Sequence, residues 1–138
     1  MLPVYDINQT TEFTHPDDTG DLKTVFLLGV LDAKTQAFVN TKFTAVEMQA
    51  DGKKDDGTTA MVPNIKIDHD GKQIEIVALG LKGVQHFGAE LKFVEKVYPF
   101  GKRRVIADES LDALKSYIPA IADAITRANE FTAADVKN

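Results

Sequence analysis

The chain has 138 residues, a formal net charge of −5 and an apolar fraction of 43%, which are ordinary values for one soluble globular domain. It contains no cysteine, which excludes disulfides, thiolate metal sites and a cysteine nucleophile, and no apolar run approaches the ~18 residues of a membrane helix. The acidic balance argues against broad nucleic-acid binding through a basic surface, and residues 1–6 lack the basic flank and apolar core of a signal peptide.

Residues 1–21 are polar and rich in turn-forming residues, which predicts an extended surface arm, with one short extended piece at residues 11–14, in front of a body at residues 22–138. The apolar side chains of this arm are too scattered to offset the cost of ordering it, roughly 1–2 kcal/mol per backbone residue. A neighbouring protein could bury them. They are therefore candidate partner-binding residues: Leu2, Val4, Tyr5, Ile7 and Phe13.

Acidic residues surround His15 in this arm, but their spacing does not match a calcium loop. A solvated loop is the favoured interpretation, and no metal is expected.

Residues 22–31 form a continuous apolar run with β-branched and aromatic members, which predicts a buried strand. Asp32 can then cap a helix from Ala33 to about Phe43. Residues 44–48 are compatible with an extension of that helix or with a new strand. Residues 50–60 are small and polar with two Asp-Gly steps, which predicts a mobile loop unless a partner covers it.

Residues 64–79 suggest a β-hairpin around which the fold is organised. Asp70-Gly71 is a signal for a type I′ turn, and folding the chain there would place Ile67 opposite Ile74. The expected fold class is therefore α+β, an antiparallel sheet around the 64–79 hairpin packed against C-terminal helices, in one domain spanning residues 1–138.

Two features after this hairpin are typical of binding loops: a GxxG pattern and a dense basic cluster. Gly80 and Gly83 form a GxxG pattern like that of KH RNA-binding loops, although a bulge or turn after a strand is the favoured interpretation. Residues 91–98 predict another strand and residues 99–101 a turn. Lys102, Arg103 and Arg104 follow as the one dense basic cluster, which is either a solvated turn or a contact for an acidic partner surface.

The C-terminal region predicts two helices. Asp108 or Ser110 can cap the first, and Pro119 suits the first turn of a second helix that ends near Phe131. Residues 132–135 resemble a capping box for a last helical turn. Apolar residues recur at spacings of three and four along one seam: Leu111, Leu114, Ile118, Ile121, Ile125 and Ala128.

Motifs for catalysis are missing from the sequence. Both serines lie in the first C-terminal helix, and there is no nucleophile elbow, Walker loop or HExxH pair. The expectation is a protein that is not an enzyme and that takes no cofactor.

Two segments carry a resemblance to a known group of proteins. Residues 78–87 (Ala-Leu-Gly-Leu-Lys-Gly-Val-Gln-His-Phe) and 131–138 (Phe-Thr-Ala-Ala-Asp-Val-Lys-Asn) resemble small morphogenesis proteins of tailed bacteriophages and prophages, which are often labelled tail-assembly-chaperone-like. Those proteins often carry Gly-Leu-x-Gly-aromatic-x-Asn-Phe and end in Leu-Thr-x-x-Glu-x-Lys-Asn. This chain departs from that pattern at Val84 and His86.

The resemblance implies a non-enzymatic virion or morphogenesis protein of the capsid, neck or tail, located in the virion or in the cytoplasm of the bacterial host. Its partners would be other phage structural or assembly proteins, including further copies of itself, with neither nucleic acid nor membrane. A tail assembly chaperone that is not retained in the virion is one alternative. A nucleic-acid-binding accessory protein, using Gly80, Gly83 and the basic cluster, is the other.

Overall fold

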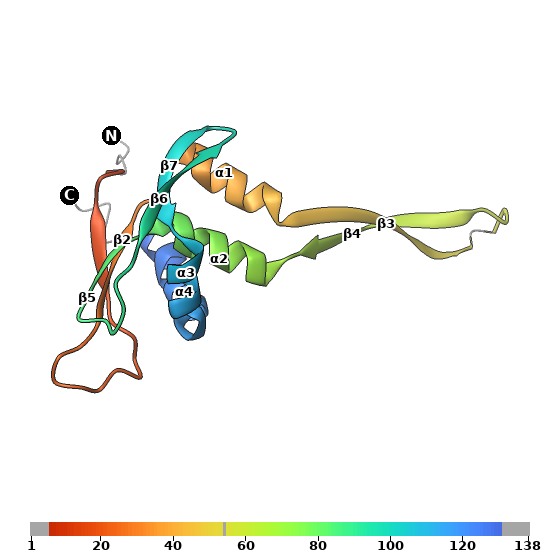
Figure 1. Ribbon diagram of the computed structural model, residues 1–138. Coiled ribbons are helices and arrows are strands. Elements are labelled where there is room, and N and C mark those ends of the chain that lie inside the picture. Colours follow the sequence, from red (N-terminus) through yellow and green to blue (C-terminus); the bar gives the residue numbers. More distant parts are fainter. Residues whose placement is uncertain (1–5, 54, 131–138) are drawn as a thin grey trace, which may run out of the picture.

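The computed structural model describes residues 6–53 and 55–130, and over these residues it confirms the α+β class (Figure 1). The strands pair antiparallel in a three-stranded sheet of order β1-β2-β5 and in two-stranded ribbons β3-β4 and β6-β7. In chain order the elements are β1 (Thr10–Phe13), β2 (Val25–Gly29), α1 (Ala33–Lys42), β3 (Thr44–Lys53), β4 (Thr59–Ile67), α2 (His69–Gly80), β5 (Leu81–Gln85), β6 (Phe93–Tyr98), β7 (Gly101–Ile106), α3 (Asp108–Ala113), a 3₁₀ turn (Lys115–Tyr117) and α4 (Ile118–Ala128).

Strand β2 is the centre of the three-stranded sheet and confirms a strand within residues 22–31, although it is shorter than predicted and covers only Val25–Gly29. Phe26 and Leu28 point to the same side and are buried, because alternate residues of a strand share one face. The extended piece expected at residues 11–14 is also present as β1, which pairs with β2 along the sheet edge. Asp32 caps α1 as expected, its carboxylate accepting a hydrogen bond from the Thr35 N–H at 2.9 Å.

The core lies where α2 packs against α4. The apolar seam of α4 is buried at Ile118, Ile121 and Ile125, and Pro119 lies in its first turn as predicted, although the helix ends at Ala128 rather than near residue 131. Gly80 permits the close approach of the two helices, because a Cβ at this position would lie 2.8 Å from Ile125 Cγ2. The larger buried side chains of this core are Phe26, Leu28, Val39, Val77, Leu81, Leu114, Ile121 and Ile125.

The predicted hairpin at residues 64–79 is wrong. Residues 69–80 form helix α2, which begins because the Asp68 carboxylate accepts a hydrogen bond from the Gly71 N–H at 3.0 Å. Gly71 also lacks the positive φ that a type I′ turn requires. The helix is favoured because it buries Ile76, Val77 and Leu79 in the core, which outweighs the period-two pattern of isoleucines that suggested strands.

The hairpin of this fold lies earlier in the chain. Strands β3 and β4 pair from Thr44↔Ile67 to Lys53↔Thr59, so residues 44–48 are a strand and not an extension of α1. The expected loop at residues 50–60 is wrong at both ends, because Ala50 and Ala60 lie within the strands. The turn is narrower and includes Gly57, which has positive φ, whereas the positive φ of Gly52 lies at the register shift of β3 between Ala50 and Lys53.

Helix α3 begins differently from the expectation. Its N-cap is Ala107, which makes no side-chain capping bond, and Asp108 is already the first helical residue. The Ser110 hydroxyl instead accepts a hydrogen bond from the Lys92 N–H at 2.8 Å and ties the helix to the segment before β6. The capping box expected at residues 132–135 lies outside the described residues.

An aromatic cluster joins the β6–β7 ribbon to α1. Phe38 of α1 meets the rings of Tyr98 and Phe100 edge-on, at centroid distances of 5.5 and 5.3 Å. Burial raises the pKa of Tyr98 to about 12, and the negative charge of Glu75 adds to the effect.

We expect Gly80→Val to lower the melting temperature by several degrees, because overpacking this helix crossing should cost about 1–3 kcal/mol. Gly88→Val is the matched control, since a Cβ at Gly88 meets nothing within 4 Å. Thermal unfolding followed by circular dichroism measures both. Equal melting temperatures for the two variants would contradict the close α2–α4 packing.

We also expect the phenol of Tyr98 in the folded protein to ionise near pH 12. The phenol of an unfolded chain ionises at about pH 10, so the folded protein holds the Tyr98 proton more tightly than the unfolded chain does. The contribution of this proton to the free energy of unfolding is fully present below about pH 10 and is lost as the pH rises through about 12. Tyrosinate absorbance during alkaline titration measures this, and Tyr98→Phe should remove the late component. A late component that survives in Tyr98→Phe would contradict the assignment.

Candidate interaction surface

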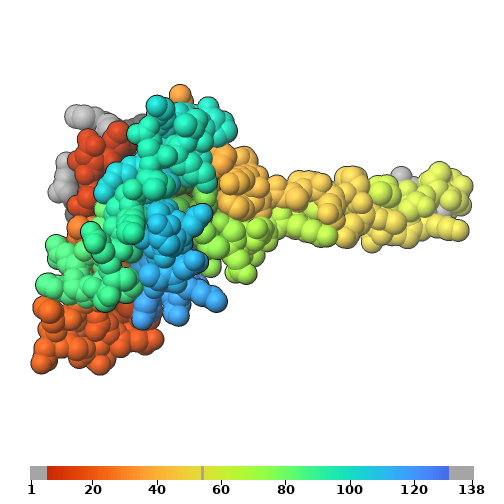
Figure 2. All heavy atoms as spheres, viewed as in Figure 1, coloured from red at the N-terminus to blue at the C-terminus, as the bar shows by residue number. Residues whose placement is uncertain are grey.

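The β3–β4 hairpin projects from the body as a narrow ribbon, in clear view in both overall pictures (Figures 1 and 2). Helix α1 ends just before β3, and α2 begins just after β4, so two helices that belong to the body hold the root of the ribbon. The Asp68 N–H donates to the Phe43 carbonyl at 2.8 Å and closes this root. The ribbon is therefore anchored at one end and free of the body along its length.

The strand register separates the side chains of the hairpin into two faces. Cross-strand partners point to the same side of a ribbon, and the pairs Val46↔Ile65 and Met48↔Pro63 are apolar, whereas Glu47↔Asn64 between them is polar. On the polar side, Lys66 Nζ lies 2.8 Å from Glu47 Oε2. We call the other side the apolar face, which consists of Val46, Met48, Ala50, Met61, Pro63, Ile65 and Ile67.

The apolar face is open to solvent. Val46 and Ile65 are 63% and 64% exposed, and Met48 and Met61 are 57% and 52% exposed. A contiguous apolar patch of this kind marks an interaction site in a soluble protein. A two-stranded ribbon without a covering layer is at best marginally stable in water. The arrangement favours a protein surface that covers this face.

The free edges of the hairpin are not equivalent. The ladder runs without interruption through Met48↔Pro63, so the Pro63 nitrogen, which carries no hydrogen, faces away from β3. A strand added beside β4 would lack one hydrogen-bond donor there. The outer edge of β3 has no such gap and is the better edge for strand addition.

The apolar face was not predicted, although the sequence contains a signal for it. Apolar residues alternate at positions 61, 63, 65 and 67, and two Asp-Gly steps precede them at residues 51–52 and 56–57. Placing the turn at Asp70-Gly71 assigned Ile65 and Ile67 to a buried sheet, whereas the structure leaves them exposed.

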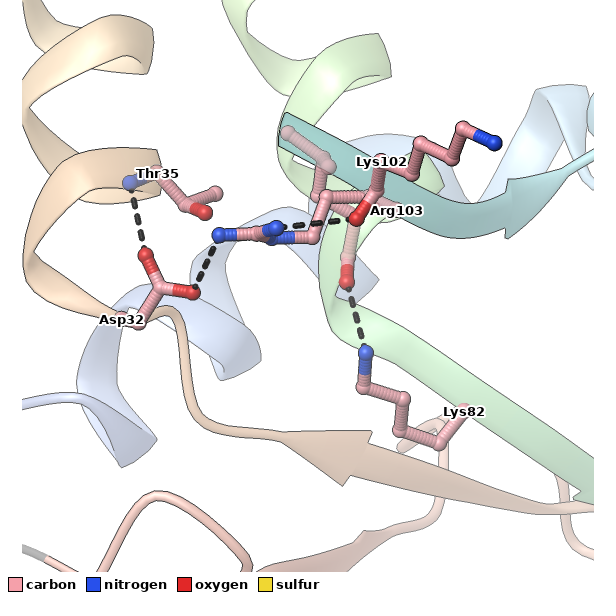
Figure 3. Close-up of polar contacts among 6 residues, drawn as sticks. Asp32, Thr35, Lys82, Lys102 and Arg103 are labelled. Atoms are coloured by element: carbon pink, nitrogen blue, oxygen red, sulfur yellow. Dashed lines mark hydrogen bonds and ion pairs between the residues drawn. The ribbon is translucent and has the colours of Figure 1, made fainter. Parts of the chain in front are cut away.

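The predicted basic cluster lies on strand β7 and is divided between its two sides. Arg103 turns toward the start of α1, where it pairs with Asp32 at 3.1 Å (Figure 3). Its guanidinium also lies over the Phe100 ring. Lys102 and Arg104 point the other way, toward Glu95 at 3.5 Å and over the Phe93 ring at 3.8 Å. The three cations therefore do not form one continuous patch, and each has a partner within the chain.

The Arg103–Asp32 pair belongs to a partly buried polar group. Burial opposes ionisation of Asp32, but hydrogen bonds from Thr35 and the charge of Arg103 together hold the pKa of this carboxyl below its ordinary value. Nearby, Lys82 Nζ donates to the Leu79 carbonyl at 3.1 Å (Figure 3). Burial lowers the pKa of Lys82, and the positive charge of Arg104 adds to the effect. The Asp32–Arg103 pair joins the start of α1 to β7, and the Lys82–Leu79 bond joins β5 to the end of α2.

The apolar residues expected to anchor an N-terminal arm are not brought near the hairpin. Leu2, Val4 and Tyr5 lie outside the described residues. Ile7 is exposed, and Phe13 lies in β1 and stacks on Phe26 with a centroid distance of 6.2 Å. Strand β1 is on the opposite side of the body from the hairpin (Figure 1).

The region around His15 forms an aromatic hollow of about 520 Å³, bounded by Phe26, Phe87 and Tyr117. His15 Nδ1 accepts a hydrogen bond from the Asp17 N–H at 3.1 Å, and its ring meets Tyr117 edge-on at 5.7 Å. Across residues 6–53 and 55–130, no group of three or more histidine or carboxylate side chains is arranged to hold a metal ion.

Comparison with known protein families, with curated proteins and with solved structures finds no match. Among the described helices, none is both long enough and apolar enough to cross a membrane. The geometry of the hairpin is therefore the main basis for a functional proposal.

We expect Ile65→Thr to change the free energy of unfolding of the isolated protein by less than about 0.5 kcal/mol, because an exposed side chain contributes little to folding. Ile121→Ala is the comparison, with an expected loss of about 2–5 kcal/mol in the core. Chemical denaturation measures both. A large loss in Ile65→Thr would mean that the body already covers the apolar face.

Proposed function

We propose that this protein is a non-enzymatic assembly subunit that docks onto neighbouring proteins through the apolar face of its β3–β4 hairpin. The observation that carries the proposal is the row of exposed apolar side chains on a ribbon that the body does not cover. The resemblance of residues 78–87 and 131–138 to small phage proteins supports the further proposal that this subunit belongs to a bacteriophage particle, as a component of the capsid, neck or tail.

The energetics favour a repeated subunit over a single pairwise contact. Five large side chains of the apolar face are about half exposed, namely Val46, Met48, Met61, Ile65 and Ile67. Covering their remaining surface contributes about 4–8 kcal/mol of favourable hydrophobic free energy. Association costs about 4–15 kcal/mol in lost freedom and side-chain ordering. One hairpin contact is therefore weak, and stable attachment needs several contacts at once, as in a particle built from many copies.

The alternatives differ in what would meet the hairpin. A tail assembly chaperone would use the same face to hold a phage protein transiently and would be absent from the finished particle. A nucleic-acid-binding role is less favoured, because the basic cluster is divided between two sides of β7 and paired within the chain.

The test compares two double variants of the hairpin, each of which adds two glutamate carboxylates. Val46→Glu/Ile65→Glu puts them on the apolar face, and Ala45→Glu/Asn64→Glu puts the same charges at the adjacent positions on the polar face. We expect the first variant to lose incorporation into purified phage particles and the second to retain it, because a buried carboxylate without a partner is costly.

Circular dichroism should show both variants folded, since all four positions lie outside the core. Equal incorporation of both variants would overturn the role of the apolar face. A wild-type protein that acts during assembly but is absent from finished particles would favour the chaperone.

A further inference from the structure

A second surface of the molecule has chemistry of its own. A groove of about 380 Å³ runs between α2, the β6–β7 ribbon and the start of α3. Its walls include Ile74, Ala78, Val94 and Leu111, of which Ile74 and Val94 are about half exposed. Part of the groove wall is therefore apolar and open to solvent.

The lining of this groove contains two buried polar atoms that lack a hydrogen bond. Within the described residues, Glu75 Oε1 and the Tyr98 hydroxyl make no hydrogen bond of good geometry, although Glu75 is only 8% exposed and Tyr98 only 6% exposed. The two side chains are neighbours, since the Glu75 carboxylate contributes to the raised pKa of Tyr98, so both atoms face the same point of the groove. Lys42 Nζ lies 3.7 Å from Glu75 Oε1, which compensates charge but is too long for a hydrogen bond. Such atoms are rare in folded proteins because leaving them unsatisfied costs about 1–3 kcal/mol.

The charges around the groove select the kind of group that could satisfy these atoms. The lining carries four carboxylates and one ammonium, from Glu75, Glu95, Asp108, Glu109 and Lys96. Lys102 offsets part of this charge, since its Nζ lies 3.5 Å from Glu95. The surplus of carboxylates opposes an anion, and the described residues do not arrange three of them for a metal ion.

We propose that this groove binds a cationic side chain, arginine in preference to lysine, from a partner protein. The alkyl stem packs on Ile74 and Val94, as long basic side chains do on apolar surfaces. The guanidinium donates to the Glu75 carboxylate and to the Tyr98 oxygen, which its several N–H groups allow and a single ammonium does less well.

The proposal deepens the proposed function, because it rests on the existence of a protein partner and names one feature of that partner's surface. The groove and the hairpin are separate surfaces of the body and the ribbon. Each can therefore be removed by mutation while the other is kept.

The experiment titrates isotope-labelled full-length protein with N-acetylarginine amide and follows the amide resonances of α2, β6 and α3. N-acetylcitrulline amide is the control, since it has nearly the same shape without the charge, and N-acetyllysine amide tests the preference. We expect saturable shifts with an affinity in the millimolar range, about −4 kcal/mol, weaker shifts with the lysine probe and none with citrulline.

Variants then assign the binding to the buried atoms. Glu75→Gln should weaken the arginine affinity at least about tenfold, whereas Glu12→Gln on the exposed strand β1 should leave it unchanged. If Glu75→Gln does not fold, Tyr98→Phe, which removes one hydroxyl, should weaken binding in the same direction. Shifts that do not saturate, equal shifts with citrulline, or unchanged affinity in the folded groove variants would overturn the proposal.

The two proposals fail separately. Arginine binding in a protein whose hairpin variants are still incorporated would remove the assembly role of the hairpin and keep the groove. Hairpin-dependent incorporation without arginine binding would do the reverse.

Discussion

The packing of α2 against α4 is the contact on which the rest of the structure depends. It exists because Gly80 lets the Ile125 side chain approach the α2 backbone, and because the seam of α4 presents Ile121 and Ile125 on the same side. Helix α2 follows β4 after a single residue and continues directly into β5. Its position therefore determines both where the hairpin leaves the body and where the third strand joins the sheet.

The body and the hairpin are stabilised in different ways. The body buries an apolar core that spans β2, α2, β7 and α4, so it has the usual hydrophobic source of stability. The hairpin has its backbone ladder, one 2.8 Å ion pair and an apolar face in water. Substitutions on the surface of such a segment cost little folding stability, and most of its apolar side chains remain free to contact a partner. This difference is the physical basis for assigning assembly to the hairpin and folding to the body.

Helix α2 also links the two surfaces that we propose for partners. Its first residues follow the hairpin root, and its middle carries Ile74 and Glu75, which line the groove. The hairpin offers an uncharged face that suits apolar partners, whereas the groove offers buried and surrounding carboxylates that suit a basic side chain. A partner that uses both would combine affinity from apolar burial with specificity from charge.

Local signals in the sequence were sufficient for several elements. The apolar run at β2, the Asp32 cap of α1, the strand at β6 and Pro119 in the first turn of α4 could all be predicted, because each depends on residues within a few positions of one another. The α+β class followed from these elements. The helical state of residues 69–80 could not be predicted, because alternating isoleucines and an Asp-Gly pair fit a hairpin as well as a capped helix, and the packing on α4 decides between them.

The candidate surfaces depend on tertiary structure even more strongly. Alternation of apolar residues indicates a strand with one apolar face, but only the arrangement of the body shows that the face of β3–β4 is left uncovered, and only the fold brings Glu75 and Tyr98 into one groove.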